Sequence, residues 1–236
     1  MTRRRFIADE VSGNHAALLG AHADHLVRVL RARTGQEFDI AAGSTVRRGR
    51  ITSIAPDRVE FELAGEVPAA AAANITLVLS IFKFDRMEWA IEKCTELGVA
   101  RIVPAIARRT DAHLASAAAK RTERWRRIAL QAAEQSRRSV PEITDPIKLQ
   151  DAMSLPARTR IVLSESEEQT QLRAALKSAK QDILLAFGPE GGWTEEELHL
   201  FQDHGWISAS LGPTILRAET AAIAAIAIAI SELRPT

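Results

Sequence analysis

The sequence predicts an α/β protein in which a small domain of β-strands precedes a larger domain with a mainly parallel, helix-covered sheet. From residue 75 onward, short apolar runs alternate with stretches of helical periodicity, which is the pattern of βα units. Before residue 68, runs of strand character are separated by turn residues. Ala69 to Ala73 form the clearest change of composition, so we predict domains at residues 1–72 and 73–236.

The composition suits a chain that folds in a reducing compartment. Hydrophobic residues make up 46% of the 236 residues, which is enough for a packed core in each domain. Cys94 is the single cysteine, so a disulfide framework is excluded. We infer no secretion signal. No uncharged run exceeds 16 residues, and the Ala-rich run Thr220 to Ser231 has 12, where a membrane span needs ~20. We expect a cytoplasmic protein that does not contact a membrane.

The first domain is predicted to be a small β-barrel with one helix. Separators such as Ala42-Gly43-Ser44 and Ala55-Pro56-Asp57 have the chemistry of turns between strands. The strands are predicted at residues 3–8, 36–41, 45–54 and 58–63.

The helix of the first domain is predicted at residues 20–33, with Leu26, Val27 and Leu30 on its apolar face. His22 and His25 lie three residues apart on this helix, so a metal site is conceivable. No cysteine or further histidine completes the ligand set, and we therefore predict no metal site.

The second domain alternates strands and helices. Asp85 followed by Glu88 indicates the cap of its first helix, and Gly98 indicates the end of that helix. Cys94 falls on the apolar face of this helix, so we expect a core residue rather than a nucleophile. Strands are predicted at residues 75–81, 101–106, 160–164, 183–187 and 206–210, and helices at 85–97, 117–138, 169–179, 195–204 and 218–233.

Two Gly-Pro loops are the strongest sign of a ligand site. Phe187-Gly188-Pro189-Glu190-Gly191-Gly192 follows a strand and precedes a helix, whose start carries the capping-box pair Thr194 and Glu197. This loop lacks the Gly-Lys-Ser/Thr of a phosphate-binding P-loop and the spacing of a dinucleotide-binding motif. Leu211-Gly212-Pro213 occupies the same place after the next strand. Because parallel α/β sheets bind ligands at the carboxyl ends of their strands, we expect the two loops to form one pocket.

Charge is unevenly distributed along the chain. Residues 1–148 carry 24 Lys and Arg against 18 Asp and Glu, whereas residues 149–236 carry 7 against 12. Within 101–140 the imbalance is 10 against 3. A polyanionic partner and an ordinary solvated helix face both explain this pattern.

Several stretches of the sequence are recognisable together: Arg4-Arg5-Phe6, His25-x-x-Arg28-Val29-Leu30-Arg31, Arg86-Met87-Glu88-Trp89, Lys93 to Val99, Gln131 to Arg138, Phe187 to Gly192 and Leu211 to Ala221. They resemble the bacterial 16S ribosomal RNA uridine-1498 N3-methyltransferase family, within the SPOUT superfamily of knotted methyltransferases. The resemblance spans nearly the whole chain in the family's order. Thr214, Ala218 and Cys94 depart from the residues that are usual in that family.

The resemblance implies a PUA-like RNA-binding β-barrel over residues 1–72 and a SPOUT methyltransferase domain over residues 73–236. It also implies a trefoil knot near the C-terminus, a homodimer that completes each active site, and S-adenosylmethionine as cofactor. Glycines let the backbone approach a ligand closely, and Glu190 would offset the positive sulfonium or serve simply as a loop carboxylate. The expected cofactor-binding residues are Leu163, Ser164, Gly188, Pro189, Glu190, Gly191, Gly192, Leu211, Gly212, Ile215 and Leu216.

The implied reaction is methyl transfer to N3 of a uridine in 16S ribosomal RNA of the small ribosomal subunit. N3 carries a proton, so Arg217 is expected to stabilise the resulting anion and Glu219 to accept the proton, although the two could instead pair structurally. The expected RNA-binding residues are Arg4, Arg5, His25, Arg28, Arg31 and Arg138.

Two other functions remain open from the sequence. One is a knotted methyltransferase that acts on transfer RNA or on another base, and product analysis distinguishes it. The other is a ribosome-assembly factor that binds RNA without catalysis, and cofactor binding distinguishes it.

Overall fold

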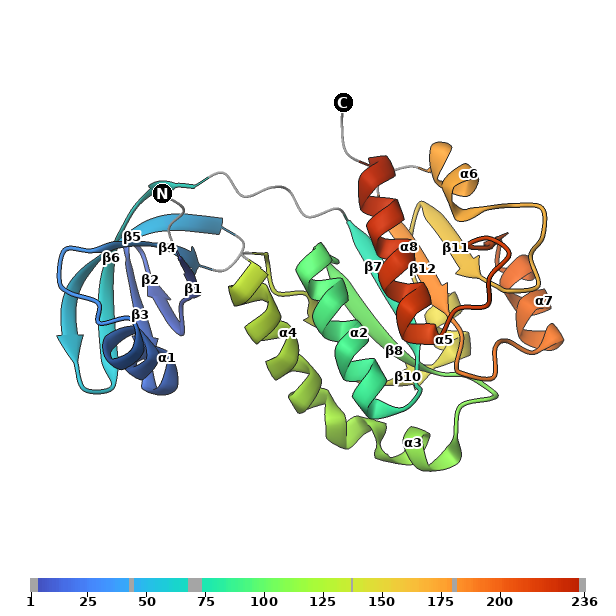
Figure 1. Ribbon diagram of the computed structural model, residues 1–236, viewed down its shortest axis with the longest axis horizontal. Coiled ribbons are helices and arrows are strands. Elements are labelled where there is room, and N and C mark those ends of the chain that lie inside the picture. Colours follow the sequence, from blue (N-terminus) through green and yellow to red (C-terminus); the bar gives the residue numbers. More distant parts are fainter. Residues whose placement is uncertain (1–3, 43–44, 68–73, 137, 180–181, 234–236) are drawn as a thin grey trace. The chain divides into compact units, whose positions relative to one another are not determined.

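A computed structural model describes residues 4–42, 45–67, 74–136, 138–179 and 182–233. Its internal contacts divide the chain into two compact units, Met1–Ala71 and Ala72–Thr236, each with its own sheet (Figure 1). The boundary that the sequence indicates, near residue 72, lies outside the described residues.

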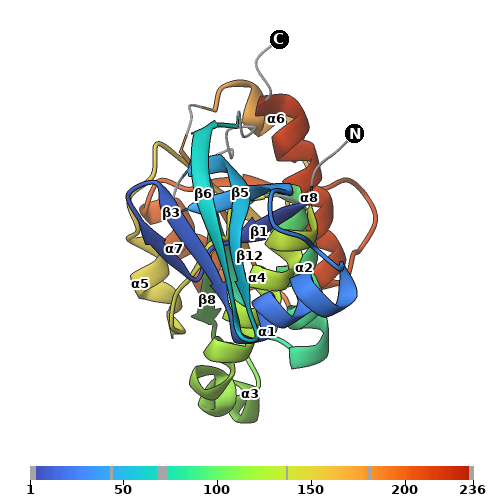
Figure 2. The same ribbon diagram turned by 90° about the vertical axis from the view of Figure 1, so that its left-hand side faces the viewer.

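The first unit is built on a six-stranded sheet of order β1-β4-β5-β6-β3-β2. Figure 2 shows β6 between β5 and β3. Among the described residues the pairings run from β1 at one edge to β2 at the other, so closure into a barrel stays a prediction. The strands are β1 Arg5–Ile7, β2 Glu10–Ser12, β3 His15–Leu19, β4 Glu37–Ala42, β5 Thr45–Ala55 and β6 Arg58–Glu66.

Four of these strands were predicted, and the hairpin of β2 and β3 was missed. Gly13 turns this hairpin with a φ of +57°, which favours glycine. The Ser-Gly-Asn signal before His15 is typical of such a turn and was available in the sequence.

The helix of the first unit is shorter than predicted. It consists of α1, Gly20–Asp24, followed by a π-helical turn at His25–Val29. Leu26 is fully buried in the core of this unit, as its place on the apolar face predicted. Arg31 has a φ of +50° and lies after the helix rather than on it.

The second unit is built on a sheet in which every pairing is parallel, with strand order β10-β8-β7-β12-β11-β13 and β9 paired to β8. All five strands predicted for this domain are present. The strands are β7 Ile75–Ser80, β8 Arg101–Ile106, β9 Glu142–Ile143, β10 Ile147–Lys148, β11 Thr159–Leu163, β12 Ile183–Phe187 and β13 Ile207–Ala209.

Helices cover both faces of this sheet. Side chains alternate between the two faces along each strand, so each strand contributes to both buried clusters. In β12, Leu185 and Phe187 pack in one buried cluster, whereas Leu184 and Ala186 pack in the other. The first cluster includes residues of α2, α4, α6 and α8, and the second includes residues of α5 and α7. Figure 1 shows α2, α4 and α8 side by side over the same face. The predicted α/β class is confirmed.

The helices of this unit mostly match their predictions. The last helix, Ala218–Leu233, has the predicted bounds, and Gly98 ends α2 in the left-handed conformation as expected. Among the described residues, no helix is both long and apolar enough to cross a membrane. The helices are α2 Phe84–Leu97, α3 Ala112–Ala117, α4 Thr122–Ser136, α5 Leu149–Met153, α6 Leu172–Lys177, α7 Glu195–Asp203 and α8 Ala218–Leu233.

Two helix starts were predicted wrongly. Lys83, not Asp85, is the N-cap of α2, and Phe84 opens the helix with its ring 6.0 Å from that of Trp125. The single helix predicted at 117–138 instead begins at Ala112, where the Asp111 carboxylate accepts from two backbone N–H groups, and passes through a 3₁₀ turn into α4. Asp111 is a typical N-cap residue, so the sequence carried this signal.

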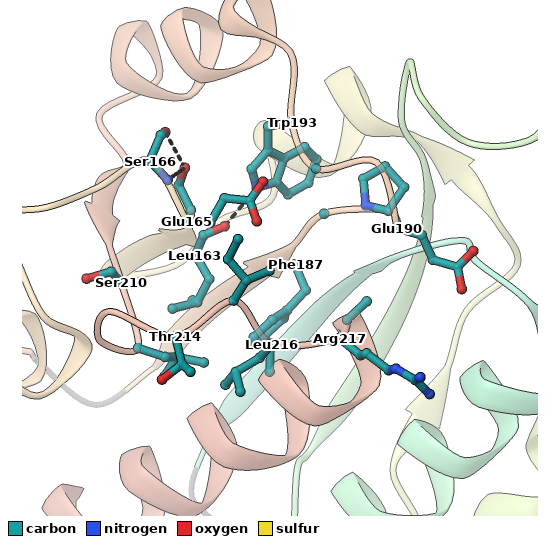
Figure 3. A pocket seen from close by; sticks show the side chains of 18 of the residues that line it. Leu163, Glu165, Ser166, Phe187, Glu190, Trp193, Ser210, Thr214, Leu216 and Arg217 are labelled. Carbon is teal, nitrogen blue, oxygen red and sulfur yellow. Dashed lines mark hydrogen bonds between the residues drawn. The ribbon is translucent and has the colours of Figure 1, made fainter.

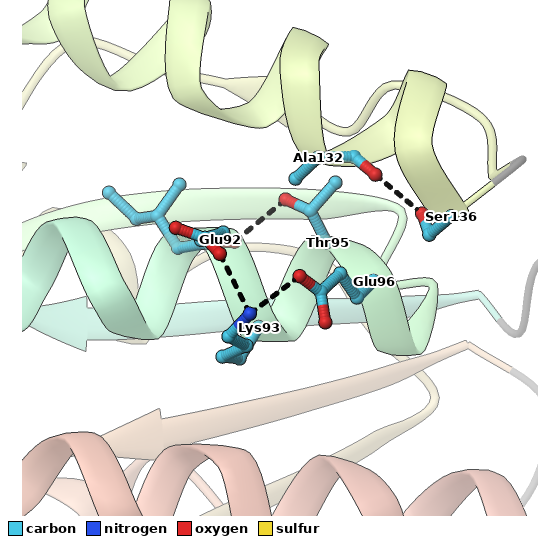
Figure 4. Close-up of polar contacts among 7 residues, drawn as sticks. Glu92, Lys93, Thr95, Glu96, Ala132 and Ser136 are labelled. Atoms are coloured by element: carbon cyan, nitrogen blue, oxygen red, sulfur yellow. Dashed lines mark hydrogen bonds and ion pairs between the residues drawn. The ribbon is translucent and has the colours of Figure 1, made fainter.

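Three polar side chains on α2 and α4 find partners within their own helices (Figure 4). The buried hydroxyl of Thr95 donates to the Ile91 carbonyl at 2.7 Å, and that of Ser136 donates to Ala132 at 2.6 Å. The Lys93 ammonium lies 2.7 Å from the carboxylates of both Glu92 and Glu96, whose hydrogen bonds raise its pKa. The two helices can therefore pack through apolar surfaces without leaving these groups unsatisfied.

Candidate functional site

A cavity of the second unit lies where β11, β12 and β13 end. It measures about 400 Å³, within the range of roughly 300–1,000 Å³ usual for ligand pockets. Both Gly-Pro loops line it, as predicted (Figure 3). Its wall also includes Arg86, Glu165, Ser166, Phe187, Trp193, Leu198, Ser210, Thr214, Ala218 and Ala221, which were not among the expected cofactor-binding residues.

The loop after β12 needs its glycines for two separate reasons. A Cβ on Gly188 would lie 3.3 Å from the Trp193 ring, so only glycine lets that ring pack against the backbone without displacement. Gly192 has a φ of +68°, and a Cβ there would lie 3.2 Å from the Glu165 carboxylate. The loop thus brings its backbone close to the cavity at both points.

Trp193 and the capping box fix the far end of this loop. The Trp193 indole N–H donates to the Leu163 carbonyl at the end of β11, and its ring packs 4.9 Å from that of Phe201 in α7. Thr194 and Glu197 form the predicted capping box at the start of α7. The loop is therefore attached to the neighbouring strand and to the helix that follows it.

A basic pair after β8 supports the same loop from outside the cavity. Arg109 donates from one guanidinium nitrogen to the carbonyl of Gly191 at 2.7 Å and to that of Trp193 at 3.0 Å. The backbone N–H of Arg108 donates to the Glu197 carboxylate at 2.7 Å. The basic excess of this segment is visible in the sequence, but its connection to the loop is not, since the contacts span more than 80 residues.

The loop after β13 forms the opposite wall. Ser210 is held by a backbone hydrogen bond of 2.8 Å from its N–H to the carbonyl of Thr170. Beyond it, Ile215 is 82% exposed and Leu216 is 37% exposed, although both line the cavity. Large apolar side chains exposed at the mouth of a pocket are positioned to be covered by a ligand or partner.

Arg86 connects two carboxylates at the edge of the cavity. It donates to Glu190 at 2.6 Å, and its Nε lies 3.8 Å from Glu219 at the start of α8. Glu190, which was expected to face the cofactor sulfonium, is therefore neutralised within the protein. In Figure 3 its carboxylate points away from the side chains of Phe187 and Leu216.

Arg217 and Glu219 lie in different environments. Arg217 is exposed and lines the cavity, whereas the Glu219 side chain is 4% exposed and does not line it. Among the described residues no ion pair joins the two, so the predicted alternative of a structural pair is not observed. One oxygen of Glu219 is buried and lacks a hydrogen-bond partner in the described part of the chain.

The expected RNA-binding residues fall on both units. Arg4, His25, Arg28 and Arg31 are exposed in the first unit, and Arg5 is half-buried in β1. Arg28 forms an ion pair of 2.6 Å with Asp24, one turn away, and its side chain is 79% exposed.

In the second unit, several basic side chains have structural partners. Arg138 donates to the carbonyl of Glu96 at 3.3 Å and packs against Gly98. Arg121 and Arg124 both face the carboxylate of Glu88. Part of the basic excess at 101–140 is thus compensated locally.

No metal or thiol chemistry is evident in the described part of the chain. Those residues contain no group of three His, Cys, Asp or Glu side chains able to hold a metal ion, and His22 instead bonds Asp9 at 2.9 Å. Burial raises the pKa of the Cys94 thiol to about 12, as expected for a core residue rather than a nucleophile.

Comparison with known proteins gives one consistent result. Residues 69–230 match the RNA methyltransferase domain family. The ribosomal RNA small subunit methyltransferase E of Aquifex aeolicus is 32% identical over 230 residues, which cover 94% of this chain and 97% of that protein.

Solved structures agree over nearly the whole length. The ribosomal RNA small subunit methyltransferase E of Neisseria gonorrhoeae, bound to S-adenosyl methionine, is 33% identical, with a TM-score of 0.83 and 96% of each chain covered. A Legionella pneumophila protein in complex with the same cofactor is 28% identical, with a TM-score of 0.83 and 98% of each chain covered.

Proposed function

Because this chain belongs to the family of the ribosomal RNA small subunit methyltransferases E, we propose that it methylates N3 of one uridine in 16S ribosomal RNA, with S-adenosylmethionine as cofactor. The observation that carries this proposal is the cavity at the ends of β11, β12 and β13, formed by two Gly-Pro loops. Relatives of similar fold are crystallised with the same cofactor.

The lining of the cavity fits the chemistry of this cofactor. Apolar side chains of Leu163, Phe187 and Leu216 suit the faces of an adenine ring, and exposed backbone groups suit its polar edge. The loop glycines leave the room that a Cβ would fill. When bound, the cofactor supplies an electrophilic methyl group. We assign its binding to ten residues that line the cavity, Leu163, Ser164, Gly188, Pro189, Glu190, Gly192, Leu211, Gly212, Ile215 and Leu216, and to Gly191, which belongs to the same loop but does not line the cavity.

The reacting uridine must be positioned and must lose its N3 proton. Positioning of reactants can supply about 7–11 kcal/mol of barrier lowering, so it is the larger requirement. Arg217, exposed at the cavity, supplies a cation that stabilises the imide anion at O2 or O4. Glu219 is buried, so it accepts the proton through an intervening water molecule rather than by direct contact.

N3 lies on the Watson–Crick edge of uracil, so the target base must be unpaired. We propose that Arg4, Arg5, His25, Arg28 and Arg31 on the first unit contact the RNA, together with Arg138 on the second. The small ribosomal subunit is the partner that presents this RNA. The exposed arginines of the first unit are the better candidates, because Arg138 already bonds a backbone carbonyl.

The finer architecture belongs to the same proposal. We assign residues 1–72 to a PUA-like RNA-binding barrel and residues 73–236 to a SPOUT domain with a trefoil knot. In support of a knot, β12 lies between β7 and β11, and Ser210 pairs with Gln171 in the segment that leaves β11. In support of a homodimer, Trp89 on α2 is 48% exposed, and α2 packs against the Ala- and Ile-rich helix α8.

Methyl transfer to small ribosomal subunits tests the proposal directly. Subunits lacking their own modification are incubated with labelled S-adenosylmethionine, and the RNA is digested and analysed by mass. We expect 3-methyluridine at a single position. Label on another base contradicts the proposed uridine chemistry, and the absence of both label and cofactor binding contradicts methyltransferase activity.

A further inference from the structure

Two carboxylates line the cavity, and the protein neutralises only one of them. Glu190 receives a hydrogen bond from Arg86 at 2.6 Å. No hydrogen bond or ion pair among the described residues involves the carboxylate of Glu165. In Figure 3 this carboxylate lies beside Trp193 on the inner side of the cavity, whereas that of Glu190 points away. Glu165 is therefore the negative charge that the cavity offers to a ligand.

The segment that carries Glu165 is fixed without using its side chain. The hydroxyls of Ser164 and Ser166 bond each other at 2.8 Å, and the backbone N–H of Ser166 donates to Ser164 Oγ at 3.3 Å. Farther along, the Glu167 carboxylate accepts from the backbone N–H groups of Gln169 and Thr170 at 2.8 and 2.9 Å. These bonds hold the backbone on both sides of Glu165, so its carboxylate is free to serve a ligand.

The opposite loop leaves room for this carboxylate. Glu165 Oε1 lies 3.2 Å from the position that a Cβ on Gly192 would occupy. The carboxylate thus lies against the Gly-Gly turn after β12, next to the backbone assigned to the cofactor. A side chain at 192 would force it to shift.

We propose that Glu165 recognises the positively charged part of the cofactor, an inference that rests on the proposed use of S-adenosylmethionine. This cofactor carries two positive charges, the sulfonium and the α-ammonium of its methionine part. S-adenosylhomocysteine lacks the sulfonium, and 5′-methylthioadenosine lacks both charges. A carboxylate facing either charge therefore distinguishes S-adenosylmethionine from 5′-methylthioadenosine, and S-adenosylhomocysteine shows which charge it faces. A contact to the adenosine part treats all three compounds alike.

The test compares Glu165→Gln with Glu168→Gln in the full-length chain by calorimetry. Glu168 is an exposed carboxylate on the same segment that does not line the cavity, so its replacement makes the same change of net charge. Exposed charges interact weakly, and we expect Glu165→Gln to weaken S-adenosylmethionine binding about fivefold. The loss should shrink at high salt, and 5′-methylthioadenosine binding should stay unchanged.

S-adenosylhomocysteine identifies which charge is recognised. An equal loss for this compound indicates the ammonium, and an unchanged affinity indicates the sulfonium; both support the proposal. Equal weakening of 5′-methylthioadenosine, no change for any compound, or the same loss in Glu168→Gln overturns it. Failure of the unaltered protein to bind S-adenosylmethionine would instead contradict the proposed function itself.

Discussion

The guanidinium of Arg86 donates to the Glu190 carboxylate at 2.6 Å and so joins helix α2 to the loop after β12. The same guanidinium approaches Glu219 to 3.8 Å, at the start of α8. One side chain thus connects the cofactor loop with the helix that follows the second Gly-Pro loop. Both loops line the proposed cofactor site, so this connection has consequences for binding.

Replacement of Arg86 should loosen the loop more than it destabilises the protein. Arg86→Gln leaves Glu190 without its partner, and because both side chains are about a third exposed, loss of this pair should cost only ~0.5–1 kcal/mol in the free energy of unfolding. Removal of the cation 3.8 Å from the buried Glu219 carboxylate adds to this loss. Cofactor affinity measured by calorimetry should fall about fivefold. Arg101→Gln is the control, because the Arg101 side chain has a similar exposure, 35%, and pairs with Glu142 at the start of β8, away from the cavity. Equal affinities in the two variants would contradict the role of Arg86.

Arg109 and Arg108 form a second matched pair. Arg109→Ala removes the hydrogen bonds to Gly191 and Trp193, and we expect kcat/KM for methyl transfer to fall roughly tenfold, since charge-assisted hydrogen bonds contribute about 1.5–3 kcal/mol. Arg108→Ala removes only an exposed ion pair with Glu196 and keeps its backbone bond to Glu197, so it should stay within about twofold. Faster amide hydrogen exchange at residues 188–193 in Arg109→Ala alone would show that the lower kcat/KM comes from a less ordered loop. If both variants behave alike, Arg109 does not position it.

A comparison of Gly192→Ala with Gly205→Ala distinguishes the cost of backbone strain from damage to the cofactor site. Both have a left-handed φ, +68° and +73°, so an alanine at either position should cost about 1–2 kcal/mol of stability. A Cβ at Gly192 also meets Glu165, whereas one at Gly205 meets nothing within 4 Å. We therefore expect similar melting temperatures for Gly192→Ala and Gly205→Ala, with weaker cofactor binding in Gly192→Ala only. Normal binding by Gly192→Ala would show that this loop tolerates a side chain there.

Cys94 should make stability fall at alkaline pH. Burial raises the pKa of its thiol from 9.0 to about 12, so the unfolded chain ionises first as the pH rises. Its contribution is complete below pH 9 and is lost between pH 9 and 12, at up to about 1.4 kcal/mol per pH unit. Denaturant unfolding of the protein and of Cys94→Ala should converge as the pH increases from 8 to 10.5. Parallel curves would mean that the thiol ionises in the folded protein.

The proposed RNA contacts can be separated from the cofactor site. Changing both Arg28 and Arg31 to Glu should weaken RNA binding and reduce the slope of log affinity against log salt by about 0.7–0.9 for each lost phosphate contact. Cofactor affinity should not change, since neither residue lines the cavity. Loss of both activities would indicate that these arginines hold the fold.

The local signals of the sequence were sufficient for most elements and for the place of the cavity between the two Gly-Pro loops. The bounds of α8 and the capping box at Thr194 depend on nearby residues, and both predictions are confirmed. The predicted cap at Asp85 is wrong, because Lys83 is the N-cap and Phe84 is the first residue of α2. Phe84 packs against Trp125 of α4, and a local sequence pattern does not reveal a contact between residues so far apart in the chain. Short strands such as β9 and β10 are two residues long and carry no periodicity.

The electrostatics of the cavity could not be predicted in the same way. The sequence placed Glu190 in the right loop but could not show that Arg86, 104 positions earlier, neutralises it. The support of the loop by Arg109 is hidden for the same reason, since it joins residues 82 positions apart. A role for Glu165 could not be predicted, because it forms no recognisable motif with its neighbours Ser164 and Ser166.

The place of β12 between β7 and β11 has a consequence for synthesis of the protein. A ribosome releases the chain from its amino end, so both neighbours of β12 are made before it. The pairing of β12 with β7 and with β11 therefore cannot be complete until residue 187 has been synthesised. The last wall of the cavity, residues 211–217, follows later still. A chain cut short between residues 187 and 211 would contain most of the sheet but no complete cofactor site.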